Sequence, residues 1–242
     1  GGEHACAIVS SASLEDQIRC WGDNSYGQLG LGHSRSVGEG GVDTVASAPA
    51  VELWDTSPPV QVTAGAAFTC ALLASGRAGC WGEDHFSLGV DSTVGDIGDE
   101  AGETAGMSPI VFGDANQLVT TMASRESYSC AVTAAGELFC WGRAGLHEMG
   151  TKDRAQQLPV QVDLGAHRSA VRVWTAKEGT CVLLDNDNVK CWSGAAFRLI
   201  NRRCGPFFGG NRYKTKDAPL LPIPAGYSAA NSAFQLVMFS RR

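Results

Sequence analysis

The chain has 242 residues, a formal net charge of −6, only 18% charged residues and 30 glycines. Few charges and many glycines disfavour helical bundles and coiled coils and favour an all-β protein with tight turns. The acidic balance disfavours a general nucleic-acid binder, whose phosphate contacts need a positive surface, and no apolar run is long enough to predict a membrane span. The chain starts without Met and shows no signal peptide, so we expect a processed chain or a piece of a longer one.

Eight of the nine cysteines fall into four pairs along the chain. The pairs are Cys6 and Cys20, Cys70 and Cys80, Cys130 and Cys140, and Cys181 and Cys191, and the last three pairs share a separation of 10 residues. The second cysteine of each pair is followed by tryptophan, at Trp21, Trp81, Trp141 and Trp192, and then by Gly22, Gly82, Gly142 and, in the fourth copy, Ser193. Such regular spacing indicates an internal repeat.

Between the cysteines of a pair, the sequence is typical of strand, turn and strand. The turn signals are Ser75-Gly76, Ala135-Gly136 and residues 185–188. A separation of 10 around such a turn places the two cysteines opposite each other, with Cα atoms about 4.5 or 5.5 Å apart, which a disulfide accepts. In the first copy, residues 10–16 lengthen the loop by an even number, which keeps the register. We therefore predict four disulfides, one within each pair.

Disulfides imply an oxidising compartment, namely the extracellular space, the cell surface or an organelle lumen. The alternative is eight reduced cysteines that pack as small buried apolar side chains. A zinc site is disfavoured because no Cys-x-x-Cys spacing occurs. Cys204 is left over, either as a free thiol or paired with another chain.

A longer unit appears when the copies are aligned on the cysteines. An alternating apolar strand comes first, as in residues 60–62 and 171–173, and Gly65-x-x-Phe-Thr-Cys70 or Gly1-x-x-His-Ala-Cys6 follows. The first copy closes with Cys20-Trp-Gly-Asp-Asn-Ser-Tyr-Gly-Gln-Leu-Gly-Leu-Gly32. This stretch resembles the signature of the regulator of chromosome condensation repeat, in a cysteine-bearing form similar to extracellular and bacterial relatives. The resemblance covers about residues 1–195 and is strongest in the first copy.

The resemblance implies an all-β fold, a β-propeller with about one four-stranded blade per repeat. Four clear repeats of roughly 50–60 residues fill residues 1–197, and residues 198–242 are interpreted as a basic loop followed by a degenerate fifth repeat or a ring-closing strand. The candidate strands there are 221–226 and 232–239. Family propellers typically close with about seven blades, so two interpretations remain: the chain forms a small ring of its own, or it is part of a seven-bladed ring.

Catalytic motifs are missing from the sequence. It has no Gly-x-Ser-x-Gly elbow, no His-Glu-x-x-His and no phosphate loop, so we expect no enzyme, no cofactor, no metal and no small-molecule substrate. His4 is interpreted as a structural position of the repeat. Residues 185–188 are similar to the start of a calcium loop, but the positions that follow do not fit, and a polar hairpin turn is the prediction.

Two charged segments are candidate interfaces. Residues 83–103 are acidic and free of Lys and Arg; the residues we single out are Glu83, Asp84, Asp96 and Asp99. Residues 198–216 are basic and contain aromatics; here we single out Arg202, Arg203, Cys204 and Arg212. Each segment is either a solvated loop or a binding surface, and their opposite charges allow head-to-tail self-association.

The predicted function is that of a non-enzymatic extracellular or luminal propeller, which serves as a protein-binding module or a structural part of a larger assembly. One alternative is a guanine-nucleotide exchange factor, the activity for which the family is named, and it implies reduced cysteines in the nucleus or cytosol. A second alternative is a propeller that inhibits an enzyme, as in one branch of the family. For the repeats we predict that each Trp packs against a neighbouring blade, on the opposite sheet face from its Cys.

Overall fold

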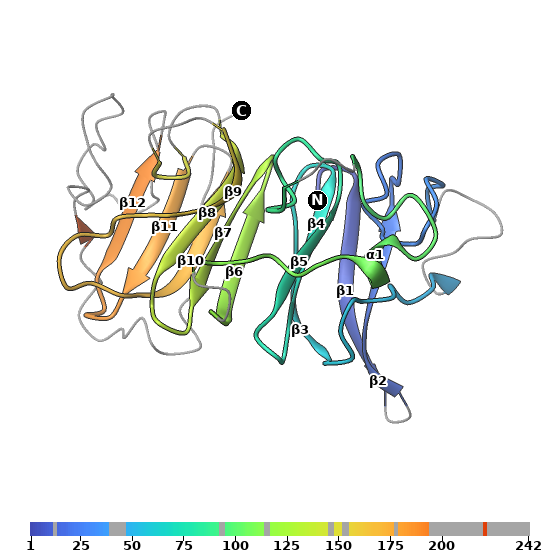
Figure 1. The fold of residues 1–242 in the computed structure, drawn as a ribbon, viewed down its shortest axis with the longest axis horizontal. Helices are drawn as coiled ribbons and strands as arrows, with labels where there is room; N and C mark the ends of the chain where they lie inside the picture. The colour runs from blue at the N-terminus through green and yellow to red at the C-terminus, as the bar shows by residue number, and fades with distance from the viewer. Residues whose placement is uncertain are drawn as a thin grey trace.

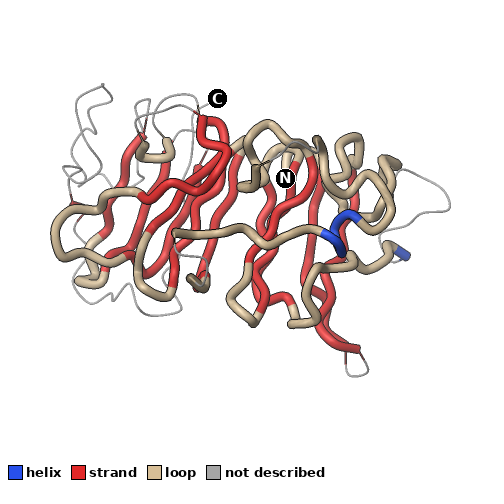
Figure 2. Tube along the Cα trace, in the orientation of Figure 1, coloured by secondary structure: helices blue, strands red, loops and turns tan. Residues whose placement is uncertain are grey.

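The computed structural model describes residues 1–11, 14–38, 47–91, 95–113, 117–144, 148–151, 155–176, 179–193 and 220–221. Within these ranges the chain forms four small antiparallel sheets and one short helix, α1 (Glu103–Gly106). The sheets follow one another in chain order along the long axis of the molecule (Figure 1), and the loops gather at the two ends of the strands (Figure 2). The predicted all-β architecture, with one sheet for each repeat, is confirmed.

Each sheet contains one of the cysteine pairs. The first sheet consists of β1 (His4–Ser11) and β2 (Leu14–Gly22), and the second of β3 (Pro59–Ala64), β4 (Phe68–Leu73) and β5 (Ala78–Gly82). The third consists of β6 (Val119–Arg125), β7 (Tyr128–Thr133), β8 (Leu138–Arg143) and β9 (Ala155–Gln161), and the fourth of β10 (Ala170–Ala176), β11 (Gly179–Leu184), β12 (Val189–Ser193) and β13 (Leu220–Leu221). The two cysteines of a pair thus lie on the two strands of one hairpin.

The hairpin turns depend on residues that accept a left-handed backbone. Gly76 and Gly136 each have a φ of 78°, and Asp187, at the same distance from its cysteine, has a φ of 60°. Glycine adopts this conformation without steric cost, and aspartate tolerates it better than most residues. In the fourth turn the backbone N–H of Asn188 donates to Asn186 Oδ1 at 3.3 Å, so this segment is the polar turn that the sequence predicted.

In three of the sheets, the strand that precedes the cysteine hairpin pairs with the same edge of that hairpin. β3 pairs with β4, β6 with β7 and β10 with β11, and Val62, Met122 and Val173 each lie opposite the residue that follows the first cysteine. In the first sheet, β2 is the partner of β1, and no described strand pairs with the other side of β1. We call this open side the β1 edge.

The hydrophobic core lies between neighbouring sheets. Every residue of β4, β7 and β11 is buried, and β4 and β7 are covered by a neighbouring sheet on both faces. One apolar cluster joins the first and second sheets, another the second and third, and another the third and fourth. Each repeat therefore buries its apolar side chains only with the help of its neighbours, as expected for a repeat protein.

Residues 198–242 lie outside the described ranges, with the exception of the short strand β13. Leu220 and Leu221 pair with Lys190 and Val189 of β12, so they form the fourth strand of the fourth sheet. Leu221, which the sequence analysis placed in a candidate strand of a fifth repeat, thus belongs to the fourth sheet. The second candidate strand, 232–239, falls outside the described residues.

Candidate functional site

The four predicted disulfides are present. Cys6–Cys20, Cys70–Cys80, Cys130–Cys140 and Cys181–Cys191 join opposed residues of each hairpin, with Cα–Cα distances of 4.0–4.1 Å. The cysteines of the first three pairs belong to the apolar cluster shared with the following sheet. Each disulfide therefore stabilises one hairpin, and the first three also contribute to the surface that the next sheet covers.

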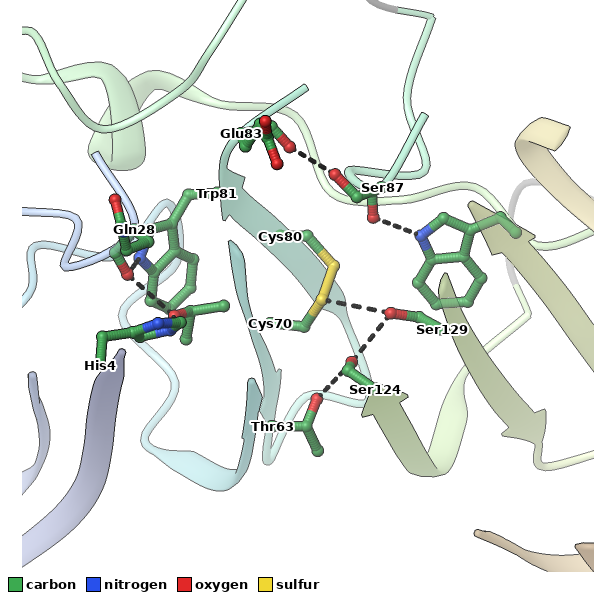
Figure 3. The surroundings of a disulfide bond; sticks show 12 residues. His4, Gln28, Thr63, Cys70, Cys80, Trp81, Glu83, Ser87, Ser124 and Ser129 are labelled. Atoms are coloured by element: carbon green, nitrogen blue, oxygen red, sulfur yellow. Dashed lines mark hydrogen bonds between the residues drawn. A yellow bond between two sulfur atoms is a disulfide. The ribbon is translucent and has the colours of Figure 1, made fainter. Parts of the chain in front are cut away.

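Three of the four tryptophans make the same contact with the preceding sheet. Trp81 Nε1 donates to Gln28 O at 3.1 Å, Trp141 Nε1 to Ser87 O at 2.9 Å and Trp192 Nε1 to Glu148 O at 2.9 Å. In each case the accepting carbonyl lies in the loop that follows the Trp-Gly dipeptide of the preceding repeat. The next residue in that loop is a buried Leu29, Leu88 or Met149. Figure 3 shows this contact for Trp81. The prediction that Trp and Cys occupy opposite faces of their sheet is confirmed for these repeats.

Hydroxyl groups reinforce the same contact in two places. Thr69 Oγ1 donates to Gln28 O at 2.8 Å, and Thr180 Oγ1 donates to Glu148 O at 2.7 Å. Each carbonyl therefore accepts two hydrogen bonds from the next sheet, which fills its capacity inside the apolar interface. Ser129, at the equivalent place in the third sheet, bonds instead with Ser124 Oγ at 2.8 Å.

Trp21 departs from the predicted equivalence of the four tryptophans. It is half-buried, and its indole N–H has no hydrogen-bond partner among the described residues, whereas Trp81 and Trp141 are fully buried. The hydroxyl position beside it is occupied by Ala5, directly opposite Trp21 in the hairpin. The physical reason is that no described sheet lies before the first one. We call Trp21 and Ala5 the open face of the first sheet.

The glycines after Trp are required by the backbone. Gly22, Gly82 and Gly142 have φ values of 104°, 109° and 110°, and a Cβ at each would lie within 2.5 Å of a carbonyl oxygen on the neighbouring strand or loop. Only glycine combines a positive φ with such a close approach. These glycines belong to the predicted repeat motif, and the geometry explains why the motif requires them.

Replacing Gly82 with alanine is expected to lower the free energy of unfolding by about 2–3 kcal/mol. An added Cβ would lie 2.5 Å from Ala67 O and 2.7 Å from Phe68 Cα, so the backbone would have to move. Gly102 is the matched control, because its φ is 82° but no atom lies within 4 Å of its Cβ position. Gly102→Ala should cost only about 1 kcal/mol. Chemical denaturation of both variants measures the difference, and equal losses would contradict the close approach.

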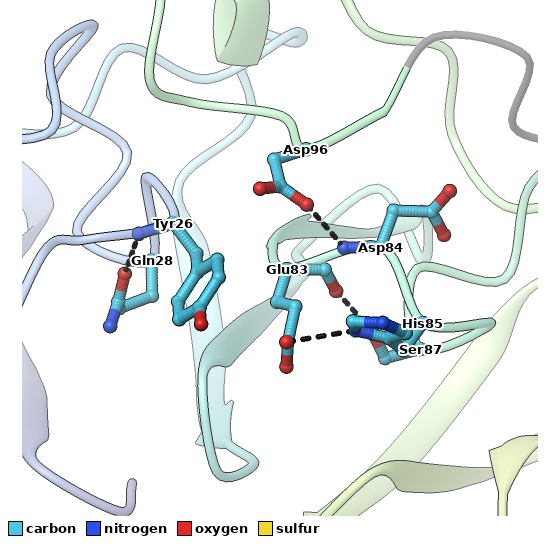
Figure 4. A network of polar contacts seen from close by, with 7 residues as sticks. All are labelled: Tyr26, Gln28, Glu83, Asp84, His85, Ser87 and Asp96. Atoms are coloured by element: carbon cyan, nitrogen blue, oxygen red, sulfur yellow. Dashed lines mark hydrogen bonds and ion pairs between the residues drawn. The ribbon is translucent and has the colours of Figure 1, made fainter.

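The acidic insert, residues 83–103, is not simply a solvated loop, because several of its described residues are buried or half-buried. It packs on the loop that closes the first repeat. Gly32 N donates to Gly98 O at 3.0 Å, and Asp84 N donates to Asp96 Oδ1 at 2.8 Å. Figure 4 shows Asp84 and Asp96 together with the ion pair between Glu83 and His85.

Two carboxyl groups of the insert are perturbed by this packing. Burial raises the pKa of Asp84, and the nearby Asp96 adds to the rise. Burial also raises the pKa of Asp99, with a further contribution from Glu103. The basic candidates Arg202, Arg203, Cys204 and Arg212 lie outside the described residues, so an association of the two charged segments stays a prediction.

His4 lies in the interface between the first two sheets and is 5% exposed. Its Nε2 is 2.9 Å from Thr69 Oγ1, whose own proton is directed to Gln28 O. Because that hydroxyl proton is already used, His4 must donate through Nε2–H and leave Nδ1 without a proton. Nδ1 is buried without a hydrogen-bond partner. Burial, together with the charged N-terminal amine, lowers the pKa of His4 to about 4.

A glutamine that the sequence analysis did not single out joins the second and third sheets. Gln61 Nε2 donates to Met122 O at 2.7 Å, and Met122 N donates to Gln61 Oε1 at 3.0 Å. The side-chain amide thus pairs with a backbone edge as a neighbouring strand would. No sequence signal marks this role, because the partner lies 61 residues away. Gln61 lines an open groove of about 780 Å³ between β3, β6 and β10, and no carboxylate lines that groove.

The described part of the chain offers few other sites. It contains no group of three or more His, Cys, Asp or Glu side chains placed to hold a metal ion. No helix within it is long and apolar enough to cross a bilayer. The candidate site is therefore the first sheet, whose open face and β1 edge have no partners among the described residues of the kind that the other sheets have.

The repeated sheets, each with a disulfide hairpin and stacked through a shared tryptophan contact, define this chain as a β-propeller protein. A family model described as "Regulator of chromosome condensation (RCC1) repeat" matches residues 16–72. This match covers one of the four copies and agrees with the predicted resemblance, and the sheets correspond to consecutive blades of an RCC1-like propeller.

Curated relatives share the repeat at low identity. The mitochondrial RCC1 domain-containing protein RUG3 of Arabidopsis thaliana is 28% identical over 198 residues, which cover 80% of this chain and 41% of RUG3. Protein pim1 of Schizosaccharomyces pombe is 27% identical over 166 residues, which cover 66% of this chain and 29% of pim1. The chain thus spans less than half the length of these relatives.

Solved structures show the same fold. Human WBSCR16 superposes with a TM-score of 0.65 at 20% identity, over 91% of this chain and 50% of that chain. Yeast RCC1 (Prp20), solved bound to Kap60, superposes with a TM-score of 0.59 at 18% identity, over 80% of this chain and 42% of that chain. The described sheets correspond to about half of these propellers.

Proposed function

We propose that this chain is a non-enzymatic protein-binding module, or a structural part of a larger assembly, in an extracellular or luminal compartment. The observation that carries the proposal is the open face of the first sheet. The equivalent faces of the other three sheets are each closed by a preceding repeat, through the hydrogen bond from Trp to a loop carbonyl. The half-buried Trp21, whose indole N–H has no partner among the described residues, favours association with another protein.

Two further observations support the proposal. Yeast RCC1 provides a precedent for a propeller of this type that binds a protein, since it was solved bound to Kap60. The four disulfides favour an oxidising compartment, because cytosolic thiols are kept reduced. The same bonds disfavour the exchange-factor alternative, which requires reduced cysteines.

Sedimentation velocity of the purified protein at physiological salt tests the assembly. We expect species larger than the monomer, and Trp21→Ala should weaken their association because it removes the largest side chain of the open face. Tyr26→Ala is the matched control, since Tyr26 is an aromatic side chain that is 41% exposed on a loop outside this face. A compact monomer at all concentrations, which also fails to co-sediment with any protein from its native source, would contradict the proposal.

Thiol titration without reductant tests the compartment. Protein isolated from its native source should show at most one free thiol among its nine cysteines, because eight are paired in the structure. Recovery of several free thiols under these conditions would point to a reducing compartment and would overturn this part of the proposal.

A further inference from the structure

The groove between β3, β6 and β10 contains a gap in a contact that is closed one step earlier. Gln61 closes the step from the second sheet to the third, because its amide bonds to both backbone groups of Met122, at 2.7 and 3.0 Å. Thr121 takes the place of Gln61 in the third sheet, and Val173 takes the place of Met122 in the fourth. Threonine is much shorter than glutamine, and no hydrogen bond joins Thr121 to Val173.

The gap leaves a backbone donor and a backbone acceptor of β10 on the groove. The N–H and C=O of Met122 point away from β7, since both bond to the amide of Gln61. Val173 has the same register on β11, so its N–H and C=O point away from β11 and towards the groove that it lines. A molecule that takes the place of the glutamine must therefore accept one hydrogen bond from Val173 and donate another to it.

The surroundings of the gap favour a negatively charged acceptor. Arg172, next to Val173, is exposed and lines the same groove, and its guanidinium bonds to no group in the part of the chain that the structure describes. No carboxylate lines the groove, so nothing there balances the charge of Arg172. A carboxylate could accept from the guanidinium, from the N–H of Val173 and from the hydroxyl of Thr121.

The C=O of Val173 narrows the choice of ligand further. An Asp or Glu side chain has no donor beside its carboxylate and would leave this carbonyl without a bond, whereas a hydroxyl next to a carboxylate supplies the donor. The rest of the groove suits a ligand with several hydroxyls, because the half-buried Trp174 adds apolar area to a lining rich in hydroxyl groups. Those hydroxyl side chains are Thr63, Thr120, Thr121, Ser124 and Thr175.

The chain's own C-terminal residues are poor candidates for the gap. Residues 194–219 and 222–242 contain eight Lys and Arg and a single acidic residue, Asp217. Their positive charge complements neither Arg172 nor a groove without carboxylates. Charge therefore favours a separate anionic ligand over these residues.

We propose that the groove binds a hydroxy-carboxylate of the sugar-acid class. Its carboxylate accepts hydrogen bonds from Arg172, Thr121 and the N–H of Val173, and its adjacent hydroxyl donates to the C=O of Val173. The groove, of about 780 Å³, is large enough for one such ligand. The inference goes beyond the proposed function and does not depend on it, because the site lies on β6 and β10 and not on the first sheet.

NMR titration of the ¹⁵N-labelled full chain with glucuronate measures the affinity and locates the site. We expect a saturable shift of the Val173 amide. Glucose lacks the carboxylate and propionate lacks the hydroxyls, so each should bind at least about tenfold more weakly. Equal binding of propionate, or of an oligo-aspartate peptide, would show that the groove selects charge alone and would overturn the ligand class. The absence of a saturable shift with glucuronate would overturn the site.

Two variants test the residues of the site. Arg172→Gln should weaken glucuronate binding about ten- to hundredfold, because charge-assisted hydrogen bonds are lost. Arg143→Gln is the matched control, since Arg143 is exposed on β8 and does not line the groove, and it should change the affinity less than about twofold. Thr121→Gln would copy Gln61 and bridge to Val173, so it should abolish binding in a folded protein. Unchanged affinity in Arg172→Gln, or in folded Thr121→Gln, would show that the ligand does not occupy the gap.

Discussion

Replacing Trp81 with alanine is expected to lower the free energy of unfolding by about 3–5 kcal/mol. Trp81 is 0% exposed, lies in the apolar cluster between the first and second sheets and donates its indole proton to Gln28 O. The substitution would leave a large cavity in that interface and would remove one of the two hydrogen bonds that join the sheets at this carbonyl. Urea denaturation of the variant and of the wild-type protein measures the loss.

Two control variants separate the causes of that loss. Trp81→Phe retains most of the apolar volume and removes only the indole N–H, so it should cost about 1–2 kcal/mol. Trp21→Ala should cost clearly less than Trp81→Ala, because Trp21 is half-buried and has no carbonyl partner among the described residues. A cost for Trp81→Ala below about 1 kcal/mol would show that the first two sheets do not depend on this contact.

The sequence was sufficient to predict the features that recur at fixed spacing. The separation of 10 between cysteines predicted the hairpins, and with them the disulfides, because register in a hairpin follows from the length of its turn. The Trp-Gly dipeptide predicted a residue that packs on one face and a backbone that turns sharply, and Gly82 shows both the positive φ and the close approach. These properties are local, so each repeat displays them in its own sequence.

Contacts between repeats could not be predicted in the same way. The carbonyl that accepts from Trp81 lies 53 residues earlier, and the amide of Gln61 reaches a backbone 61 residues later. Nothing in the local pattern near Gln61 distinguishes it from an ordinary exposed strand residue. The equivalence predicted for Trp21 is not seen among the described residues, because its environment depends on a preceding sheet that they do not include.

His4 combines both kinds of information. Its place in the repeat was predicted from the Gly-x-x-His pattern, but its protonation state follows from Thr69, which lies 65 residues away. With the hydroxyl proton of Thr69 given to Gln28 O, the folded protein accommodates only the neutral imidazole, whose Nδ1 is buried and unpaired. Protonation would place a charge inside the interface, and burial therefore lowers the pKa of His4 to about 4, against the smaller opposing effects of Asp23 and of the backbone at Phe68.

The interface between the first two sheets should therefore weaken in mild acid. His4 has a pKa of about 4 in the folded protein and about 6.5 in the unfolded chain, so the unfolded chain binds the extra proton between these values. The contribution of His4 to stability is fully present above about pH 6.5 and is lost as the pH falls towards 4. A shift of this size corresponds to about 3 kcal/mol.

His4→Phe is the variant that isolates this effect, because Phe68 occupies the register equivalent of His4 in the second sheet. Free energies of unfolding at pH 7 and at pH 4 should differ by about 3 kcal/mol more for the wild-type protein than for His4→Phe. The comparison of the two proteins removes the contributions of Asp84 and Asp99, whose raised pKa values act in the opposite direction and are common to both. The same pH dependence in both proteins would show that His4 is already accessible to protons in the folded state and that the first two sheets are not closed around it.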